Sequence, residues 1–155
     1  MAISVSYEKC TNCRICELAC SFKKHKEFNP SLSRIRVFNK YKEGLSVPIL
    51  CKECENPPCV EICPTRPLKA LNKDEKTGLI KVNKEICIGC KSCVLACPFG
   101  AISWHDSVKL PLICDFCDGD PQCVKYCPAD VLHFVPITAL GQEKRLNYAT
   151  KVKSF

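Results

Sequence analysis

The sequence predicts an α+β protein in which short strands and short helices surround metal-binding cysteines in two nested units. Three observations support this prediction. The chain has 155 residues and 16 of them are cysteine, far above ordinary usage. The cysteines fall into four closely spaced groups of four, with none left over. Short apolar runs typical of strands flank these groups, so cysteine sites rather than one large apolar core organise the fold.

Composition leaves few other classes open. The hydrophobic fraction of 46% includes the cysteines, and the rest is thin for a self-sufficient core of this size. No apolar run reaches the roughly 18 residues that cross a membrane, and the first nine residues lack the features of a secretion signal. We therefore expect a cytoplasmic protein with no membrane span. In a reducing compartment, so many cysteines favour metal binding over a disulfide scaffold.

The cysteines form four quartets, numbered here in chain order. Their members are Cys10, Cys13, Cys16 and Cys20; Cys51, Cys54, Cys59 and Cys63; Cys87, Cys90, Cys93 and Cys97; and Cys114, Cys117, Cys123 and Cys127. The third quartet has the spacing C-x2-C-x2-C-x3-C-P, which bacterial ferredoxins use for a [4Fe–4S] cluster. The second and fourth quartets lengthen only the middle gap. The first has Ser21 where the proline would stand. Four quartets predict four [4Fe–4S] clusters.

The spacing has a physical reason. Three closely spaced thiolates wrap three corners of an iron–sulfur cube, and the fourth cysteine of such a motif ligates the other cluster of a pair. We expect turns at Thr11–Asn12 and Ile88–Gly89 to aim backbone N–H groups at the clusters. We also expect each fourth cysteine to begin a helix that leads away. Structural zinc is disfavoured, because zinc usually takes two C-x2-C pairs a dozen or more residues apart.

Short strands are predicted on both sides of the quartets. Those that precede a quartet are Ile3–Tyr7, Val47–Leu50, Ile80–Val82 and Leu110–Ile113. Those that follow one are Leu68–Leu71, Ala101–Trp104 and Val131–Val135. Residues 68–82 indicate a hairpin with its turn at Asp74–Gly78. A helix is expected from Cys16 to Lys24, with shorter helices just after Cys59, Cys93 and Cys123. Residues 21–46 form an insertion with one strand candidate, Ser33–Phe38.

The spacing of the quartets predicts how the units nest. Quartets two and three would form an inner ferredoxin-like unit, residues 46–104. Quartets one and four would pair across it as an outer dicluster unit, residues 1–45 and 105–135. Residues 136–155 would form a partly helical C-terminal tail.

The charge distribution is more informative than the net charge. The formal charge of +7 counts the cysteines as neutral, and thiolate-ligated clusters would bring the protein close to neutrality. Basic residues concentrate in residues 22–42 and again in residues 141–155. The first run indicates either a solvated face that offsets anionic clusters or a docking face for an acidic partner. Nucleic-acid binding is disfavoured, because few aromatic side chains accompany the run.

Nothing in the sequence predicts a catalytic site in this chain. Neither G-x-G-x-x-G nor the phosphate-binding P-loop motif is present, and His25, His105 and His133 lie far apart in the sequence. A redox sensor is an alternative, but four complete quartets exceed what sensing requires. We therefore expect an electron-transfer protein rather than an enzyme.

The quartet pattern resembles the four-cluster ferredoxin subunits of the dimethyl sulfoxide reductase iron–sulfur family over about residues 3–135. The opening segment, YEKCTNCRICELACSFKKHKEFNPSLSRIRVF, most resembles the small electron-transfer subunits of tungsten aldehyde:ferredoxin oxidoreductases. The resemblance implies an anaerobic protein that relays electrons between a catalytic large subunit, a tungsten or molybdenum aldehyde oxidoreductase, and a ferredoxin or flavoprotein. Carbon monoxide dehydrogenase, formate dehydrogenase and hydrogenase are alternative partners. A free polyferredoxin, or self-association of copies, is also open.

The resemblance further implies crossed ligation, in which quartet one pairs with four and quartet two with three. The implied ligand sets are Cys10, Cys13, Cys16 and Cys127; Cys114, Cys117, Cys123 and Cys20; Cys51, Cys54, Cys59 and Cys97; and Cys87, Cys90, Cys93 and Cys63. Some family members replace one ligand and hold a three-iron cluster. No ligand is replaced here, so four [4Fe–4S] clusters are implied. Ser21 departs from the family pattern and is expected to loosen the helix start after Cys20.

Overall fold

The computed structural model describes residues 1–139, so most of the predicted tail, residues 140–155, lies outside the described residues. Its helices are α1 (Ile15–His25), α2 (Pro58–Glu61), α3 (Ser92–Ala96) and α4 (Gln122–Lys125). Its strands are β1 (Ala2–Val5), β2 (Arg36–Lys40), β3 (Leu45–Ile49), β4 (Leu71–Lys73), β5 (Ile80–Val82), β6 (Ser103–Trp104), β7 (Pro111–Leu112) and β8 (Leu132–Val135). The predicted architecture of short strands and short helices is confirmed. No helix within residues 1–139 is long and apolar enough to cross a membrane.

The strands form four separate antiparallel pairs rather than one sheet. They pair as β1 with β8, β2 with β3, β4 with β5, and β6 with β7. A two-stranded ribbon is marginal alone in water, so these pairs depend on what packs between them. The buried core mixes cysteines with aliphatic side chains, of which Ile35, Leu50 and Leu132 are almost fully buried.

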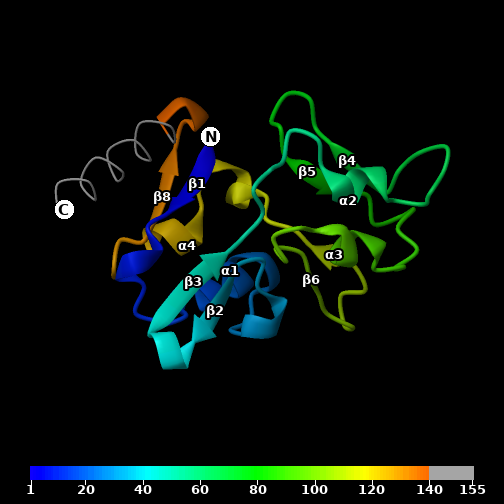
Figure 1. The fold of residues 1–155 in the computed structure, drawn as a ribbon. Coiled ribbons are helices and arrows are strands. Elements are labelled where there is room, and N and C mark those ends of the chain that lie inside the picture. Colours follow the sequence, from blue (N-terminus) through cyan, green and yellow to red (C-terminus); the bar gives the residue numbers. More distant parts are fainter. Residues whose placement is uncertain (140–155) are drawn as a thin grey trace.

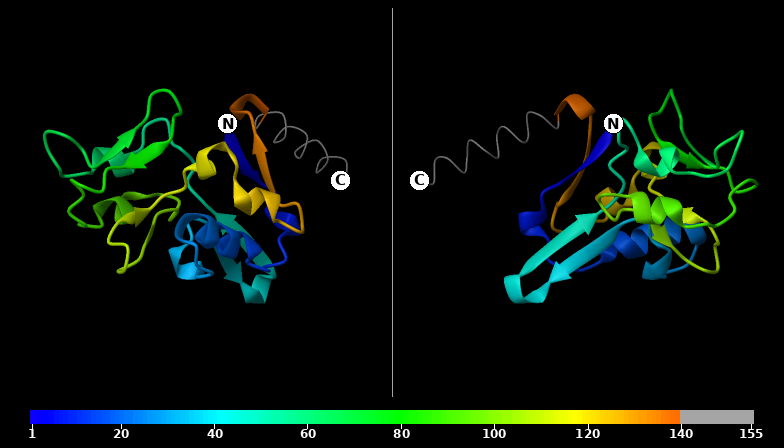
Figure 2. Two further views of the ribbon diagram at one scale, coloured as in Figure 1. Left: turned by 180° about the vertical axis from the view of Figure 1, so that it is seen from behind. Right: turned by 45° about the vertical axis from the view of Figure 1, so that its right-hand side comes forward.

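The elements separate into two groups in space (Figure 1). The outer elements, β1, α1, α4 and β8, carry or flank quartets one and four; β1 pairs with β8, and α1 packs against α4. The inner elements, α2, β4, β5 and α3, carry or flank quartets two and three; α2 packs against both α3 and β4. The view from behind in Figure 2 shows the same separation. The predicted boundary between residues 45 and 46 passes through the β2–β3 pair.

Every predicted strand overlaps an observed one, and the smallest overlap is at β4. The observed strand shares only Leu71 with the predicted Leu68–Leu71. The Ala70 N–H donates to Thr65 Oγ1 at 2.7 Å, and Pro67 has no N–H to donate. The segment before Leu71 is therefore committed to a loop around Cys63. The hairpin itself forms as predicted, with β5 at Ile80–Val82.

The helices begin earlier than the sequence predicts. Each helix begins one residue before the third cysteine of a quartet, so these cysteines lie in first turns; they are Cys16, Cys59, Cys93 and Cys123. The prediction that the fourth cysteine begins a helix is wrong. Cys63, Cys97 and Cys127 instead come after the ends of α2, α3 and α4. A proline follows each of them, and a proline disfavours helical backbone at the residue before it.

The helix α1 is longer because Ser21 stands where the other quartets have proline. Cys20 therefore lies inside α1, which continues to His25. The Ser21 side chain is fully buried. Its hydroxyl donates to the Leu18 carbonyl at 3.0 Å and accepts the Asn29 N–H at 3.2 Å. The expectation that Ser21 loosens this region is wrong, because the residue both extends the helix and anchors the following loop.

Candidate iron–sulfur sites

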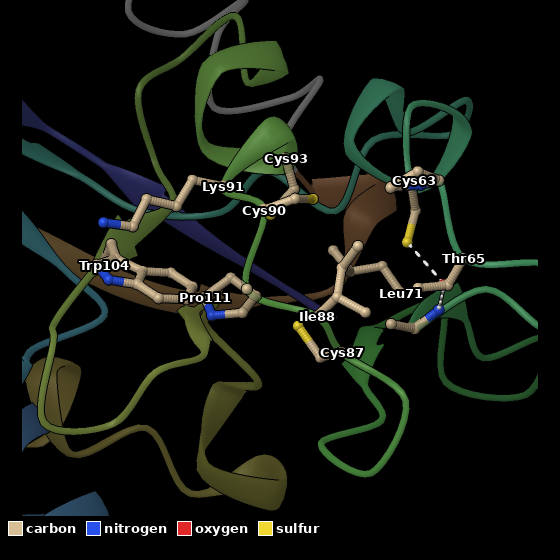
Figure 3. A pocket seen from close by; sticks show the side chains of 13 residues that line it. Cys63, Thr65, Leu71, Cys87, Ile88, Cys90, Lys91, Cys93, Trp104 and Pro111 are labelled. Atoms are coloured by element: carbon tan, nitrogen blue, oxygen red, sulfur yellow. Dashed lines mark hydrogen bonds between the residues drawn. The ribbon is translucent and has the colours of Figure 1, made fainter.

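All 16 cysteines are free thiols, and two pockets each gather four of them from two quartets. One pocket is lined by Cys10, Cys13 and Cys16 of quartet one together with Cys127 of quartet four. We call this group site 1. The other pocket, shown in Figure 3, is lined by Cys87, Cys90 and Cys93 of quartet three together with Cys63 of quartet two. We call this group site 4.

We group the other eight cysteines on the same crossed pattern. We call Cys20, Cys114, Cys117 and Cys123 site 2, and Cys51, Cys54, Cys59 and Cys97 site 3. The Cys20 thiol lies close enough to the other three members of site 2 for its ionised form to raise their pKa values. In site 3, Cys97 and Cys54 each act on the pKa of Cys59 in the same way. Cys20 therefore lies near the first three cysteines of quartet four, and Cys97 lies near Cys59 of quartet two.

These groups fit iron–sulfur clusters by their donor chemistry. A [4Fe–4S] cluster is held by four cysteine thiolates, and sites 1 and 4 each offer four thiols around one pocket. Among the described residues, 1–139, no three His, Cys, Asp or Glu side chains are gathered to hold a metal ion. At sites 1 and 4 the thiols instead line pockets.

A left-handed backbone residue recurs at the same place in every quartet. It is the second residue between the first two cysteines, with φ of 59° at Asn12, 47° at Glu53, 69° at Gly89 and 54° at Phe116. This conformation costs a non-glycine residue on the order of 1–2 kcal/mol, so its repetition indicates a turn that the sites impose. The sequence predicted the turns at Asn12 and Gly89. It contains no signal at Glu53 and Phe116, because neither residue type favours this region.

Every fourth cysteine has a hydrogen-bond donor near its sulfur. The Ala101 N–H donates to Cys97 Sγ at 3.4 Å, and the Val131 N–H donates to Cys127 Sγ at 3.4 Å. Each donor lies four residues after its cysteine. The Cys63 sulfur lies 3.3 Å from the Thr65 hydroxyl. Hydrogen bonds to ligand sulfurs favour the thiolate and tune the reduction potential of a cluster.

Cys20 receives its hydrogen bond from the insertion, because the chain that follows it continues as helix. The Arg34 N–H donates to Cys20 Sγ at 3.3 Å. The Arg34 guanidinium and the Lys24 ammonium both donate to one oxygen of Asp115, at 2.6 and 2.7 Å. Burial opposes ionisation of Asp115, but these two cations hold its pKa below the ordinary value. Arg34 and Lys24 lie 81 and 91 residues from Asp115 in the chain. No local sequence pattern therefore predicts these two ion pairs, which we call the Asp115 bridge.

Burial raises the pKa of several of the cysteine thiols when no metal is bound. It raises the pKa of both Cys16 and Cys123 to about 12, and that of Cys114 still further. Cys63 differs: burial raises its pKa, but hydrogen bonds from Thr65 and neighbouring backbone groups outweigh burial and lower the pKa to about 7. Metal ligation at Cys16, Cys114 and Cys123 must therefore displace protons, which couples cluster assembly to pH.

Comparison with known proteins identifies relatives along the whole chain. The model of the 4Fe-4S dicluster domain family matches residues 43–137, and that of a 4Fe-4S binding domain matches residues 7–23. The chain is 44% identical to the polyferredoxin-like subunit of aliphatic sulfonate oxidoreductase from Pyrococcus furiosus, over 97% of this chain and 91% of the relative. It is 33% identical to a subunit of anaerobic dimethyl sulfoxide reductase from Escherichia coli, over 90% and 75%. It is 30% identical to subunit 2 of formate hydrogenlyase from Escherichia coli, over 86% and 80%.

A solved structure has a similar fold. It is the active site complex BamBC of benzoyl coenzyme A reductase, matched with a TM-score of 0.50 and 24% identity over 99% of this chain and 90% of that one. The two matched 4Fe–4S regions and the 16 cysteines fit four [4Fe–4S] clusters, as the sequence predicted. The predicted resemblance to subunits of the dimethyl sulfoxide reductase type is likewise confirmed.

Proposed function

The protein belongs to the 4Fe-4S dicluster domain family, and we propose that it is the electron-transfer subunit of an oxidoreductase complex, carrying electrons between a catalytic subunit and a second carrier. Bound clusters supply the one-electron chemistry. The chain's own role is to hold the clusters, keep water from them and adjust them through hydrogen bonds to sulfur.

The observation that carries this proposal is a row of cysteine groups. Three pairs of thiols from neighbouring groups lie close enough for one to raise the pKa of the other; they are Cys16 with Cys123, Cys51 with Cys114, and Cys59 with Cys93. These pairs link site 1 to site 2, site 2 to site 3, and site 3 to site 4. At the two ends, Cys13 of site 1 and Cys90 of site 4 are exposed. A row with both ends near solvent suits transfer through the protein.

We also propose that sites 1 to 4 are the four ligand sets, so that each cluster takes its fourth ligand from a partner quartet. The pockets of sites 1 and 4 support this crossed scheme, as do the electrostatic neighbours of Cys20 and Cys97. Replacing Cys97 tests it most directly, because the crossed and uncrossed schemes assign this residue to different clusters.

In the Cys97→Ser variant, about four irons should be lost from each chain, as expected for one [4Fe–4S] cluster. Anaerobic alkylation followed by mass spectrometry should then label Cys51, Cys54 and Cys59 faster than in the wild type. Cys87, Cys90 and Cys93 should stay protected. Faster labelling of the third quartet with the second still protected would contradict the crossed scheme.

For the catalytic subunit, we propose a tungsten or molybdenum oxidoreductase that acts on aldehydes. The resemblance of the opening segment supports this choice. Relatives also belong to oxidoreductases named for aliphatic sulfonate and dimethyl sulfoxide. A formate- or hydrogen-linked complex is the alternative, favoured by the relative in formate hydrogenlyase.

The experiment is an anaerobic affinity purification from the native host at low salt, with metal analysis of the proteins that co-elute. Tungsten or molybdenum in a large subunit supports the proposal, and aldehydes and sulfonates can then be compared as electron donors. Nickel in the co-eluting proteins would contradict the proposal and indicate a hydrogenase or carbon monoxide dehydrogenase as the partner. Iron alone, at about 16 per chain, would make the protein a free polyferredoxin.

A further inference from the structure

An open groove runs between α1 and α4 on the outer elements. Its volume is about 440 Å³, and it is separate from the pockets of sites 1 and 4. Four of its lining residues are the immediate chain neighbours of cysteines; they are Ile15, Ala19, Gln122 and Tyr126, next to Cys16, Cys20, Cys123 and Cys127. Two of these cysteines belong to site 1 and two to site 2. A molecule seated in the groove would thus lie against the helices that hold both sites.

The groove is lined by aromatic side chains that are unusually exposed. Phe28 is 68% exposed, Tyr126 is 57% exposed and Phe22 is 45% exposed. Phe22 and Phe28 stack on each other with ring centroids 4.6 Å apart, so these two exposed rings form one surface. Contiguous exposed apolar surface of this kind marks an interaction site, because leaving it in water is unfavourable.

The charge of the residues that line the groove indicates what kind of molecule binds there. The charged residues among those that line it are Lys23 and Lys26, and within residues 1–139 no acidic residue lines it. Other cations of the same basic run are engaged elsewhere: Lys24 and Arg34 bind Asp115. Residues 140–155 of this chain carry four basic residues and one acidic residue, so their net positive charge does not complement Lys23 and Lys26. The complementary occupant is an acidic surface that presents an apolar side chain.

We propose that the α1–α4 groove is the docking site for a small acidic electron-carrier protein, which exchanges electrons with sites 1 and 2. This inference rests on the proposed electron-transfer function and adds where the carrier binds and its chemistry. Complexes for electron transfer are typically small and short-lived. An apolar centre with a charged rim suits them, since opposite charge speeds encounter while a small contact allows release.

The test uses the full-length holo-protein and a small acidic bacterial ferredoxin as the probe. Transfer of electrons from the reduced ferredoxin is followed by stopped-flow absorbance at several salt concentrations. In the Lys23→Glu/Lys26→Glu variant, the second-order rate constant at low salt should fall about tenfold, because steering is lost. The matched control is Lys42→Glu/Lys76→Glu, which changes the net charge equally at exposed sites outside the groove. Its rate constant should change less than about twofold.

A second pair of variants tests the apolar centre of the groove. Phe28→Ser should lower the rate constant at low and at high salt, because loss of apolar contact is little affected by ionic screening. Phe38→Ser is the control, since Phe38 is 52% exposed but lies on β2, outside the groove. Iron content and circular dichroism must match the wild type in all four variants, so that a failure to fold is not read as a failure to dock.

Three outcomes overturn the docking proposal. If the rate constant fell equally in the two double-lysine variants, net charge alone would steer the ferredoxin. Unchanged rates in all variants would mean that the groove is not used. A wild-type dimer that Lys23→Glu/Lys26→Glu dissociates, seen by sedimentation, would make a second copy the occupant. The proposed function is tested separately: if dithionite cannot reduce the clusters of the wild type, electron transfer itself fails.

Discussion

The outer and inner elements carry or flank equal numbers of cysteines, but they differ in the length of their helices and strand pairs. On the outer side, α1 has 11 residues, α4 has four, and β1–β8 has four residue pairs. On the inner side, α2 has four residues, α3 has five, and β4–β5 has three pairs. Helices and ribbons this short are not stable alone. The difference indicates that the inner elements depend more heavily on their clusters than the outer elements do.

Removing the iron should have the largest effect and tests this comparison directly. After anaerobic chelation, amide hydrogen exchange measured by mass spectrometry should show that α2, α3 and β4–β5 lose all protection. The helix α1 should keep part of its protection, because Asp115, Ser21 and Glu17 tie it to other segments through hydrogen bonds that need no metal. Equal loss of protection in both groups would contradict the comparison.

Breaking the Asp115 bridge should weaken the outer elements without changing their ligands. In Asp115→Asn, Lys24 and Arg34 lose their shared carboxylate, while the Asn oxygen can still accept the Cys117 N–H that Asp115 accepts at 3.1 Å. We expect the free energy of unfolding to fall by about 1.5–3 kcal/mol, the usual range for hydrogen bonds to charged groups. Anaerobic urea unfolding of the holo-protein measures it. A variant as stable as the wild type would show that the insertion is held by other contacts.

The buried side chain of Glu17 should contribute as much as Asp115, or less, to the free energy of unfolding. Glu17 is 2% exposed, and its Oε1 accepts the Val37 N–H at 2.7 Å, which joins α1 to β2. Glu17→Leu leaves that buried N–H unpaired, at a cost of about 1–3 kcal/mol. Glu17→Gln keeps an oxygen acceptor and should lose less. If both variants unfold at the same urea concentration, the hydrogen bond to Val37 is not what stabilises this contact.

The sequence predicted best what short-range chemistry determines. Cysteine spacing predicted the four clusters, and Asp74–Gly78 predicted the inner hairpin turn, because a handful of neighbouring residues specifies each feature. The starts of α1 and α3 were predicted wrongly because each follows a residue that gives no helix signal. Lys91, for example, adopts left-handed backbone at φ 62° just before α3. The bridge at Asp115 and the Arg34 N–H on Cys20 could not be predicted, since they join segments far apart in the chain.

The smallest effect is expected at an ion pair on the surface of the inner hairpin. The Lys81 ammonium and hydrogen bonds from Thr77 lower the pKa of Asp74 below its ordinary value. A carboxyl with a lowered folded-state pKa stabilises above its unfolded value of about 3.9 and loses that contribution as the pH falls further. Asp74→Asn should therefore be slightly less stable than the wild type at neutral pH, and the gap should narrow as the pH falls through about 3.9.

The comparison of Asp74→Asn with Asp115→Asn sharpens the contrast between the two groups. Asp74 pairs with Lys81, whose side chain is 58% exposed, whereas the Lys24 partner of Asp115 is 13% exposed. Water and salt screen an exposed pair, so added salt should remove most of the Asp74 effect and little of the Asp115 effect. The measurement is the difference in urea midpoint from the wild type at low and high salt. If added salt reduced the two stability differences equally, the protein around Asp115 would shield charge from solvent no better than the surface around Asp74. The argument that the outer elements have more support from the protein would then rest on helix length alone.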